Sequence, residues 1–220
     1  MKGLFIFTSI CSLTGFFPLI LGVKKIKLIN NFYHTFIIYI SIACLTEVTG
    51  RLLLLLHKNE FATILSNIYV FVEGLFFLIL FLEWGILKNK STFYLLLILL
   101  TVMWLTENVI LNSIKNINSS QIIIYSIFTV ILSTQLLQKR YFNNQSYFSK
   151  DPLAIISTTF IINYTYRAVF ESIYLFKLNF SNSFYFNAFL IFIILNVFSN
   201  CTYTYAIHCM SQRKRLTSFY

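Results

Sequence analysis

Long apolar runs separated by short polar or basic stretches form the dominant pattern of this chain. Each run is a nearly continuous series of Leu, Ile and Phe, without the strict alternation that half-buried strands require. A helix needs roughly 20 apolar residues to cross a bilayer, and only helices or closed barrels satisfy their backbone groups there. The pattern predicts seven membrane-spanning helices, at about 4–22, 33–56, 61–87, 92–113, 121–137, 153–176 and 184–207.

Composition supports the same class. The 220 residues are 58% hydrophobic and 11% charged, with a mean hydropathy of +0.76, whereas soluble domains are about 25% charged. We therefore expect an all-α integral membrane protein, with a seven-helix bundle over 1–207, a basic tail over 208–220 and no separate globular domain. A signal peptide is the alternative for the first run, but that run is long and lacks a small-residue cleavage site.

Lysine and arginine are distributed unequally between alternate connections, which predicts the orientation. The richer set of connections holds Lys24, Lys25, Lys27, Lys88, Lys90, Lys139, Arg140, Lys150, Arg213, Lys214 and Arg215. The poorer set holds Lys2, Lys58, Lys115 and Lys177. Because cytoplasmic loops are enriched in Lys and Arg, we expect the N-terminus outside and the C-terminus in the cytoplasm. The bias toward Lys, Asn, Ile and Phe is typical of an AT-rich genome and suggests a bacterial inner (plasma) membrane.

Charged residues at membrane depth are the most informative feature, because each costs at least a few kcal/mol unless it is paired or hydrated. Glu47 and Arg51 on the second predicted helix have i,i+4 spacing, as do Arg167 and Glu171 on the sixth, in reversed order. Counted from the outer helix ends, Glu47 and Arg167 lie about 13 Å deep, and the other two lie about 7 Å deep. We expect a four-charge cluster that joins the two helices.

Other polar side chains fall in the same outer half of the membrane. The full candidate cluster, for ligand binding or ion pairing, comprises Glu47, Arg51, Glu73, Glu107, Arg167, Glu171, Asn163, Asn187 and Asn196. Tyr69, Tyr164 and Tyr166 are expected to add hydroxyl groups to it. The alternatives are a salt-bridge network that fixes helix packing, a pocket open to the outside, and a path for protons or ions.

Three further residues next to charged side chains carry expectations. Gly50 and Gly74, beside Arg51 and Glu73, would permit close helix approach or leave space for a ligand. Trp84, at the cytoplasmic end of the third span, is expected at the membrane interface.

Several chemistries are excluded by the residues. The chain has no HExxH, GxSxG, P-loop or Gly-rich dinucleotide motif, and no lysine inside a span for a retinal Schiff base. The three histidines lie near helix ends at different faces of the membrane, and the four cysteines lie within or at the ends of spans. We therefore expect no catalytic residues, no metal, no cofactor and no disulfide framework.

Two similar distances along the chain suggest an internal repeat. Glu47 precedes Glu73 by 26 residues, and Glu171 precedes Asn196 by 25 residues. In each case a charged helix is followed by a polar one, as in transporter folds built from repeats. This spacing suggests that helices one to three and five to seven form parallel repeats joined by helix four.

Three function classes remain open. The first is ligand sensing or binding in an outward-facing polar pocket, with output through a cytoplasmic partner that contacts the 138–151 loop and the basic tail. The second is a small transporter, channel or pore, acting as a homo-oligomer, for example as an accessory protein of bacterial defence. The third is an intramembrane enzyme that acts on a lipid-like substrate, with Glu73 as general base. Although the net charge is +10, we expect no nucleic-acid binding, because the basic residues lie between apolar runs that contact the lipid bilayer.

Overall fold

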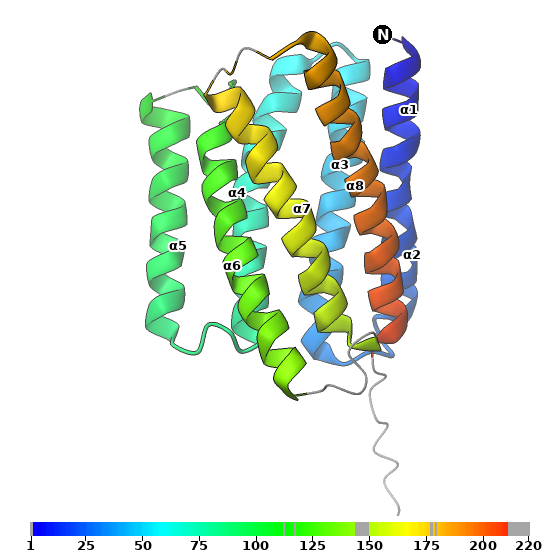
Figure 1. The fold of residues 1–220 in the computed structure, drawn as a ribbon, viewed down its shortest axis with the longest axis vertical. Helices are drawn as coiled ribbons and strands as arrows, with labels where there is room; N and C mark the ends of the chain where they lie inside the picture. Colours follow the sequence, from blue (N-terminus) through cyan, green and yellow to red (C-terminus); the bar gives the residue numbers. More distant parts are fainter. Residues whose placement is uncertain are drawn as a thin grey trace, which may run out of the picture.

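The computed structural model describes residues 2–111, 113–116, 118–143, 150–176, 178 and 180–210. Within these ranges, seven helical segments are long and apolar enough to cross a membrane, which confirms the predicted class. They stand side by side as one bundle, with the N-terminus at one end and the last turn of α8 at the other (Figure 1). The helices are α1 (Lys2–Ser12), α2 (Phe16–Lys25), α3 (His34–Leu55), α4 (Asn59–Glu83), α5 (Lys90–Leu105), α6 (Ser119–Asn143), α7 (Pro152–Leu175) and α8 (Asn182–Cys209).

The first span, Phe7–Lys25, is interrupted by a short 3-10 turn at Leu13–Gly15 that separates α1 from α2. The hydroxyl groups of Ser12 and Thr14 each donate to a carbonyl three residues earlier, at 2.9 and 2.7 Å. Pro18 follows in the first turn of α2 and has no N–H to continue the α-helical ladder. These local hydrogen bonds compete with regular α-helix geometry and account for the break.

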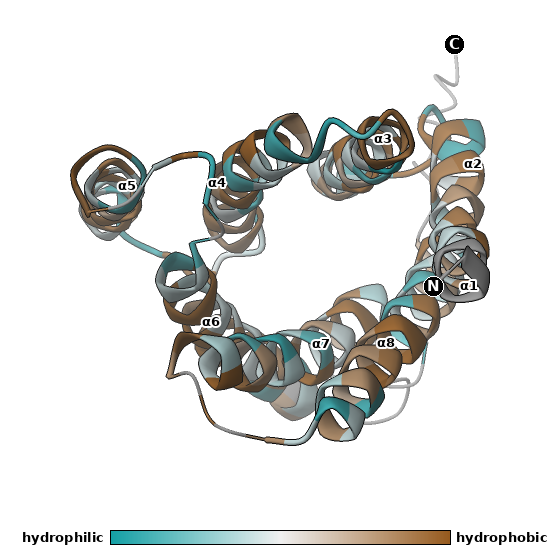
Figure 2. Ribbon diagram, turned by 90° about the horizontal axis from the view of Figure 1, so that it is seen from above, coloured by the Kyte–Doolittle hydropathy of each residue, from teal (hydrophilic) through white to brown (hydrophobic). Residues whose placement is uncertain are grey.

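Viewed end-on, the helices form a ring in the order α2, α3, α4, α6, α7 and α8 (Figure 2). α1 continues α2 and contacts α8 and α3. α5 stands outside the ring, against α4 and α6, and Leu100 is the one residue of α5 that is buried in the described structure. A six-residue π-helix, Thr106–Leu111, extends α5 toward the α5–α6 connection. α5 is therefore the most peripheral helix of the bundle.

Aromatic side chains pack together in the interior of the ring. This aromatic core consists of Phe36, Tyr39, Phe77, Phe81, Trp84, Phe160 and Tyr203. Its rings meet closely, with centroids 5.0 Å apart for Phe77 and Phe160. Along α3 the buried positions end at Cys44, and along α7 they end at Tyr164. The bundle is thus tightly packed at the end where α3 and α7 begin. It is packed more loosely toward the opposite end, where α1 begins.

Trp84 corrects one expectation about the membrane interface. Its side chain is 3% exposed and packs against Phe36, Phe81 and Phe160 in the aromatic core. The prediction rested on position along the chain, but Trp84, the C-cap of α4, faces the interior of the bundle. The interfacial assignment of Trp84 was therefore wrong.

The predicted end of the fifth span was too early. α6 continues from the expected end at 137 to Asn143, because Gln138, Lys139 and Arg140 are good helix formers and no Gly or Pro interrupts them. Six of the fourteen residues of the expected 138–151 loop are therefore helix, while residues 144–149 of that loop and the basic tail from 211 onward lie outside the described residues. Arg140 Nε lies 2.9 Å from Asp151 Oδ2 and joins the end of α6 to the start of α7.

Basic side chains at the same end of the bundle bind backbone carbonyls. Gly85 follows the C-cap of α4, and its φ of +70° lets the chain turn there. Lys139 Nζ donates to the Gly85 carbonyl over 3.0 Å. Lys25 Nζ donates to the carbonyl of His208 over 3.2 Å. These contacts agree with the cationic character of this end; its assignment to the cytoplasm, and the 3+1+3 repeat, remain predictions.

Candidate functional site

A buried ion pair lies in the middle of the bundle. Glu73 on α4 has a side chain 3% exposed, and its Oε2 accepts a hydrogen bond from Arg167 Nη1 on α7 over 2.8 Å. Glu73 points inward because it shares a helix face with Val70 and Phe77, at i–3 and i+4, which are both buried. The pair connects two helices on opposite arcs of the ring.

Four tyrosine hydroxyl groups surround the same carboxylate. Tyr125 donates to Oε2 over 2.5 Å and Tyr164 donates to Oε1 over 2.8 Å. Tyr39 and Tyr69 each donate to Oε1 over 3.2 Å. These tyrosines come from α3, α4, α6 and α7, so one carboxylate joins four helices. We call Glu73, Arg167 and these four tyrosines the Glu73 centre.

The donors around Glu73 saturate it. A carboxylate offers about four lone-pair sites, and here five donors, the four hydroxyls and the guanidinium, converge on it. No site on Glu73 is left for an additional ligand in this arrangement. Glu73 therefore joins helices in this conformation, and a role as general base would first require the centre to open.

Arg167 makes fewer of its possible hydrogen bonds than Glu73 does. Its guanidinium lies 5.4 Å from the ring centroid of Tyr125 and 5.9 Å from that of Tyr164, within range of cation–π attraction. Of its five N–H groups, one makes a hydrogen bond with the described residues. The side chain of Arg167 is 18% exposed, compared with 3% for Glu73.

The second charged pair lies apart from this centre. Arg51 donates from Nε and Nη2 to Glu47 Oε1, both over 3.2 Å, and from Nη1 to Thr8 Oγ1 on α1 over 3.0 Å. Both side chains are partly exposed, at 27% for Arg51 and 39% for Glu47. Arg51 thus links α3 to α1.

The expected four-charge cluster does not form in the described structure. Arg167 pairs with Glu73 on α4, and Glu47 pairs with Arg51 on its own helix. Glu171 accepts a hydrogen bond from Ser119 Oγ over 2.7 Å, at the start of α6. The expectation rested on depth along the helices, but depth does not determine the direction in which each side chain leaves its helix.

A pocket of about 400 Å³ of empty space lies beside the Glu47–Arg51 pair. We call it the α1–α3–α8 pocket after the helices that form it. α1 and α3 supply a mainly polar wall, and α8 supplies a mainly apolar one. Its lining residues are Thr8, Cys11, Ser12, Glu47, Arg51, Phe189, Phe192, Ile193 and Asn196.

The remaining candidates lie elsewhere. Glu107, 8% exposed on the π-helix, accepts the backbone N–H of Gln121 over 3.0 Å and so caps the start of α6. Asn163 on α7 is half-buried, and Asn187 on α8 is exposed. Neither asparagine lines the α1–α3–α8 pocket or bonds to the Glu73 centre. Of the nine candidates, Glu73 and Arg167 form one ion pair, and Glu47, Arg51 and Asn196 line the α1–α3–α8 pocket.

Tyrosines contribute more to the site than the sequence indicated. Tyr69 and Tyr164 do bind Glu73, but Tyr166 donates instead to the backbone carbonyl of Ala188 on α8 over 2.6 Å. Tyr39 and Tyr125 were not among the expected site residues. In a chain with 14 tyrosines, nothing in the local sequence separates these two from tyrosines at the membrane interface.

No group of three or more His, Cys, Asp or Glu residues suited to a metal ion occurs in the part of the chain that the structure describes. Comparisons with protein-family models, with curated proteins and with solved structures found no match. The function is therefore argued from the geometry of the two polar sites.

Proposed function

We propose that this polytopic membrane protein binds a small zwitterionic, amino-acid-like ligand in the α1–α3–α8 pocket, and that it acts as a sensor. The observation that carries the proposal is the position of Glu47 and Arg51, side by side and partly exposed, in a pocket with an apolar opposite wall. A ligand with an ammonium group, a carboxylate and an apolar substituent matches all three features.

Glu47 and Arg51 both have hydrogen-bonding groups that no described residue uses. Both hydrogen bonds from Arg51 to Glu47 end on Oε1, so Glu47 Oε2 accepts none from the described residues. Arg51 uses three of its five N–H groups, two toward Glu47 and one toward Thr8. A ligand ammonium would bind Glu47 Oε2, and a ligand carboxylate would bind the free N–H groups of Arg51.

The apolar wall accounts for the rest of the ligand. Phe189, Phe192 and Ile193 face the charged pair across the pocket, and Asn196 adds one amide to this side. Small-molecule sites are commonly apolar cavities with a few polar groups that fix orientation. This wall would contact the apolar substituent of the ligand.

The packing favours sensing over transport. α3 carries Glu47 and Arg51 in its second half and Tyr39, which donates to Glu73, in its first half. A ligand that shifts α3 would therefore disturb the Glu73 centre and the helices joined there. The aromatic core fills the ring beyond Glu73, which opposes passage of a solute in this conformation. Output would require a cytoplasmic partner, for which the 138–151 segment and the basic tail are the proposed contacts.

Thermal stabilisation of the purified protein in detergent tests this proposal. L-leucine and L-phenylalanine are the probes, and isovalerate and isoamylamine are the controls that lack one of the two charges. A ligand that binds the folded state stabilises it by RT ln(1 + [L]/Kd). We expect a saturable rise in the melting temperature with the zwitterions and a much smaller one with either control.

Matched variants separate binding from folding. Arg51→Gln and Asn196→Leu should abolish or weaken the shift, whereas Glu60→Gln should retain it, because Glu60 pairs with Lys115 on the exposed surface. Equal shifts for leucine and isoamylamine, or no shift with any probe, would contradict the proposal. Uptake of labelled leucine into proteoliposomes would favour the transport class instead.

A further inference from the structure

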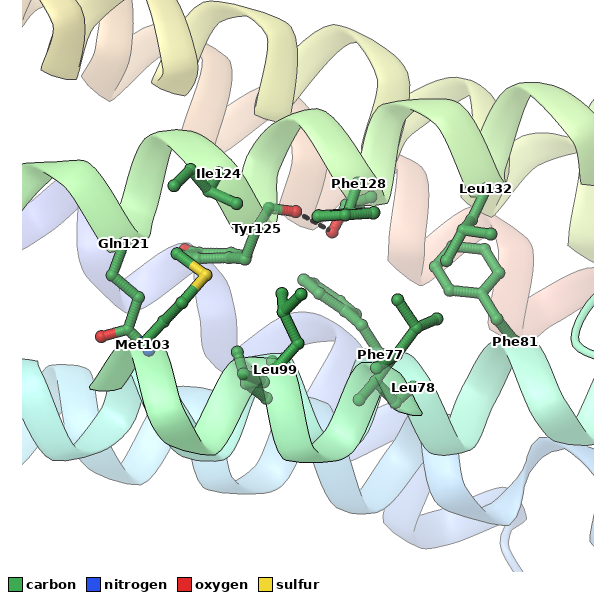
Figure 3. Close-up of a pocket in the computed structure, with 14 residues that line it drawn as sticks. Phe77, Leu78, Phe81, Leu99, Met103, Gln121, Ile124, Tyr125, Phe128 and Leu132 are labelled. Carbon is green, nitrogen blue, oxygen red and sulfur yellow. Dashed lines mark hydrogen bonds between the residues drawn. The ribbon is translucent and has the colours of Figure 1, made fainter. Parts of the chain in front are cut away.

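A second pocket, of about 510 Å³ of empty space, lies between α4, α5 and α6. Its lining is almost entirely apolar, with Phe77 and Leu78 at the back and Leu99 and Phe128 nearer the opening (Figure 3). It is separate from the α1–α3–α8 pocket, and the inference below does not depend on the proposed function. We call it the α4–α6 pocket.

The α4–α6 pocket opens sideways toward the lipid. Leu99 on α5 is 42% exposed, and Ile124 and Phe128 on α6 are 36% and 38% exposed. Phe77 and Leu78 on α4 are at most 9% exposed. In a membrane, the gap between α5 and α6 would therefore be reached from the hydrocarbon region rather than from water. An apolar chain is the occupant that such a route supplies.

One polar group in the lining has no protein partner. Gln121 is 1% exposed, and its Nε2 makes no hydrogen bond with any described residue. Its side chain extends from α6 toward Met103 at one end of the α4–α6 pocket (Figure 3). A buried unsatisfied donor costs about 1–3 kcal/mol, so its retention points to a ligand that offers an acceptor.

The depth of Gln121 in the membrane indicates which group supplies that acceptor. Gln121 is the third residue of α6, so it lies within about 5 Å of the helix end and close to the membrane surface. From Gln121 to Leu132, the α6 wall of the pocket runs about 16 Å toward the bilayer interior. A bilayer phospholipid has this arrangement, with ester carbonyls near the surface and apolar chains that descend from them.

We propose that the α4–α6 pocket binds one acyl chain of a bilayer phospholipid, which enters between α5 and α6. The ester carbonyl of the lipid accepts a hydrogen bond from Gln121 Nε2, and the methylene groups lie along Leu99, Phe128 and Leu132. The site also reaches the Glu73 centre, because Tyr125 lines the pocket while its hydroxyl binds Glu73. The bound lipid thereby supports the position of Tyr125.

Photo-crosslinking of the full chain in liposomes tests this inference. The probe is a phosphatidylcholine with a diazirine in one acyl chain, and crosslinked residues are identified by peptide mass spectrometry. We expect adducts on inward-facing lining residues, such as Leu78 and Thr129, in addition to the outer surface of α5. Leu99→Trp should fill the opening and remove the inward adducts, whereas Leu95→Trp, on the lipid-facing surface of α5, should leave them.

The polar contact is tested independently of the pocket shape. Gln121→Leu should lower the yield of inward adducts about fivefold, the effect of losing one net hydrogen bond of about 1 kcal/mol. Gln135→Leu, at an exposed position of the same helix, is the control and should not change the yield. Adducts confined to outward residues such as Leu95 and Ile98 would overturn the proposal, as would equal yields for Gln121→Leu and Gln135→Leu.

Discussion

Arg167 on α7 donates to Glu73 on α4 over 2.8 Å, and this bond joins two arcs of the helix ring through its interior. Desolvation of such a pair often cancels its attraction, so the pair alone would be weak support for the fold. Here the tyrosine hydroxyls replace the water that Glu73 loses. The side chains of the Glu73 centre thus satisfy one another, and removal of one leaves the others with fewer hydrogen-bond partners.

This dependence predicts the outcome of breaking the ion pair. Arg167→Met should reduce the free energy of unfolding by about 3–5 kcal/mol, because it leaves the Glu73 carboxylate buried without its counter-ion. The double variant with Glu73→Gln should regain part of that loss, because the buried charge is then removed as well. Unfolding in mixed detergent micelles measures both. If the double variant loses more unfolding free energy than the two single variants together, the paired arrangement is contradicted.

The tyrosines should contribute unequally to stability. Tyr125 and Tyr164 make the shorter hydrogen bonds to Glu73, at 2.5 and 2.8 Å, while Tyr69 donates over 3.2 Å. We expect Tyr125→Phe and Tyr164→Phe to cost about 1–2 kcal/mol each, and Tyr69→Phe to cost less. The same unfolding measurement ranks the three. Tyr94→Phe, at an exposed position of α5, is the control outside the centre. A Tyr69 variant more damaging than either of the others would reverse the expected order.

The sequence predicted the spans well because hydrophobic length is a local property. The depths of Glu47, Arg51, Arg167 and Glu171 along their helices were estimated from the same local information. That information could not give the partner of Arg167, because that depends on which helix lies opposite α7 and how α4 is rotated. The ring places Glu73 there, and the depth argument had treated Glu73 only as a neighbour in the same layer.

The α4–α6 pocket was beyond the sequence for a related reason. Gln121 lies near the beginning of a helix, where a polar residue is ordinary, and only the packing of α5 makes it buried. Tyr125 likewise resembles an interfacial tyrosine until the structure turns it toward Glu73. Burial in a membrane bundle is decided by the neighbouring helix, so these roles need the assembled fold.

Two glycines with the same expectation from sequence have different surroundings. A Cβ added at Gly74 would lie 3.0 Å from both Cδ atoms of Leu100, whereas one at Gly50 would meet nothing within 4 Å. Gly74 thus allows α5 to approach α4, and Gly50 does not serve close packing against any residue that the structure describes.

Alanine substitution should separate these roles. Gly74→Ala should destabilise the protein by about 1–3 kcal/mol through overpacking, and Leu100→Ala should partly relieve that effect in the double variant. Gly50→Ala should be neutral or stabilising by up to about 1 kcal/mol, because alanine favours the helix. Thermal unfolding compares the variants. Similar losses at Gly74 and Gly50 would show that the approach of Leu100 is not the cause.

The orientation rests on the distribution of basic residues and can be tested directly. In a variant in which the native cysteines are replaced by alanine, Ser113→Cys lies in the α5–α6 connection and Lys88→Cys lies in the α4–α5 connection. These connections are at opposite ends of the bundle, and the positive-inside rule places the second in the cytoplasm. A membrane-impermeant maleimide should therefore label Ser113→Cys in intact cells and Lys88→Cys only after permeabilisation. The reverse pattern would place the α1–α3–α8 pocket in the cytoplasmic half of the membrane, and the proposed sensor would then respond to an internal ligand.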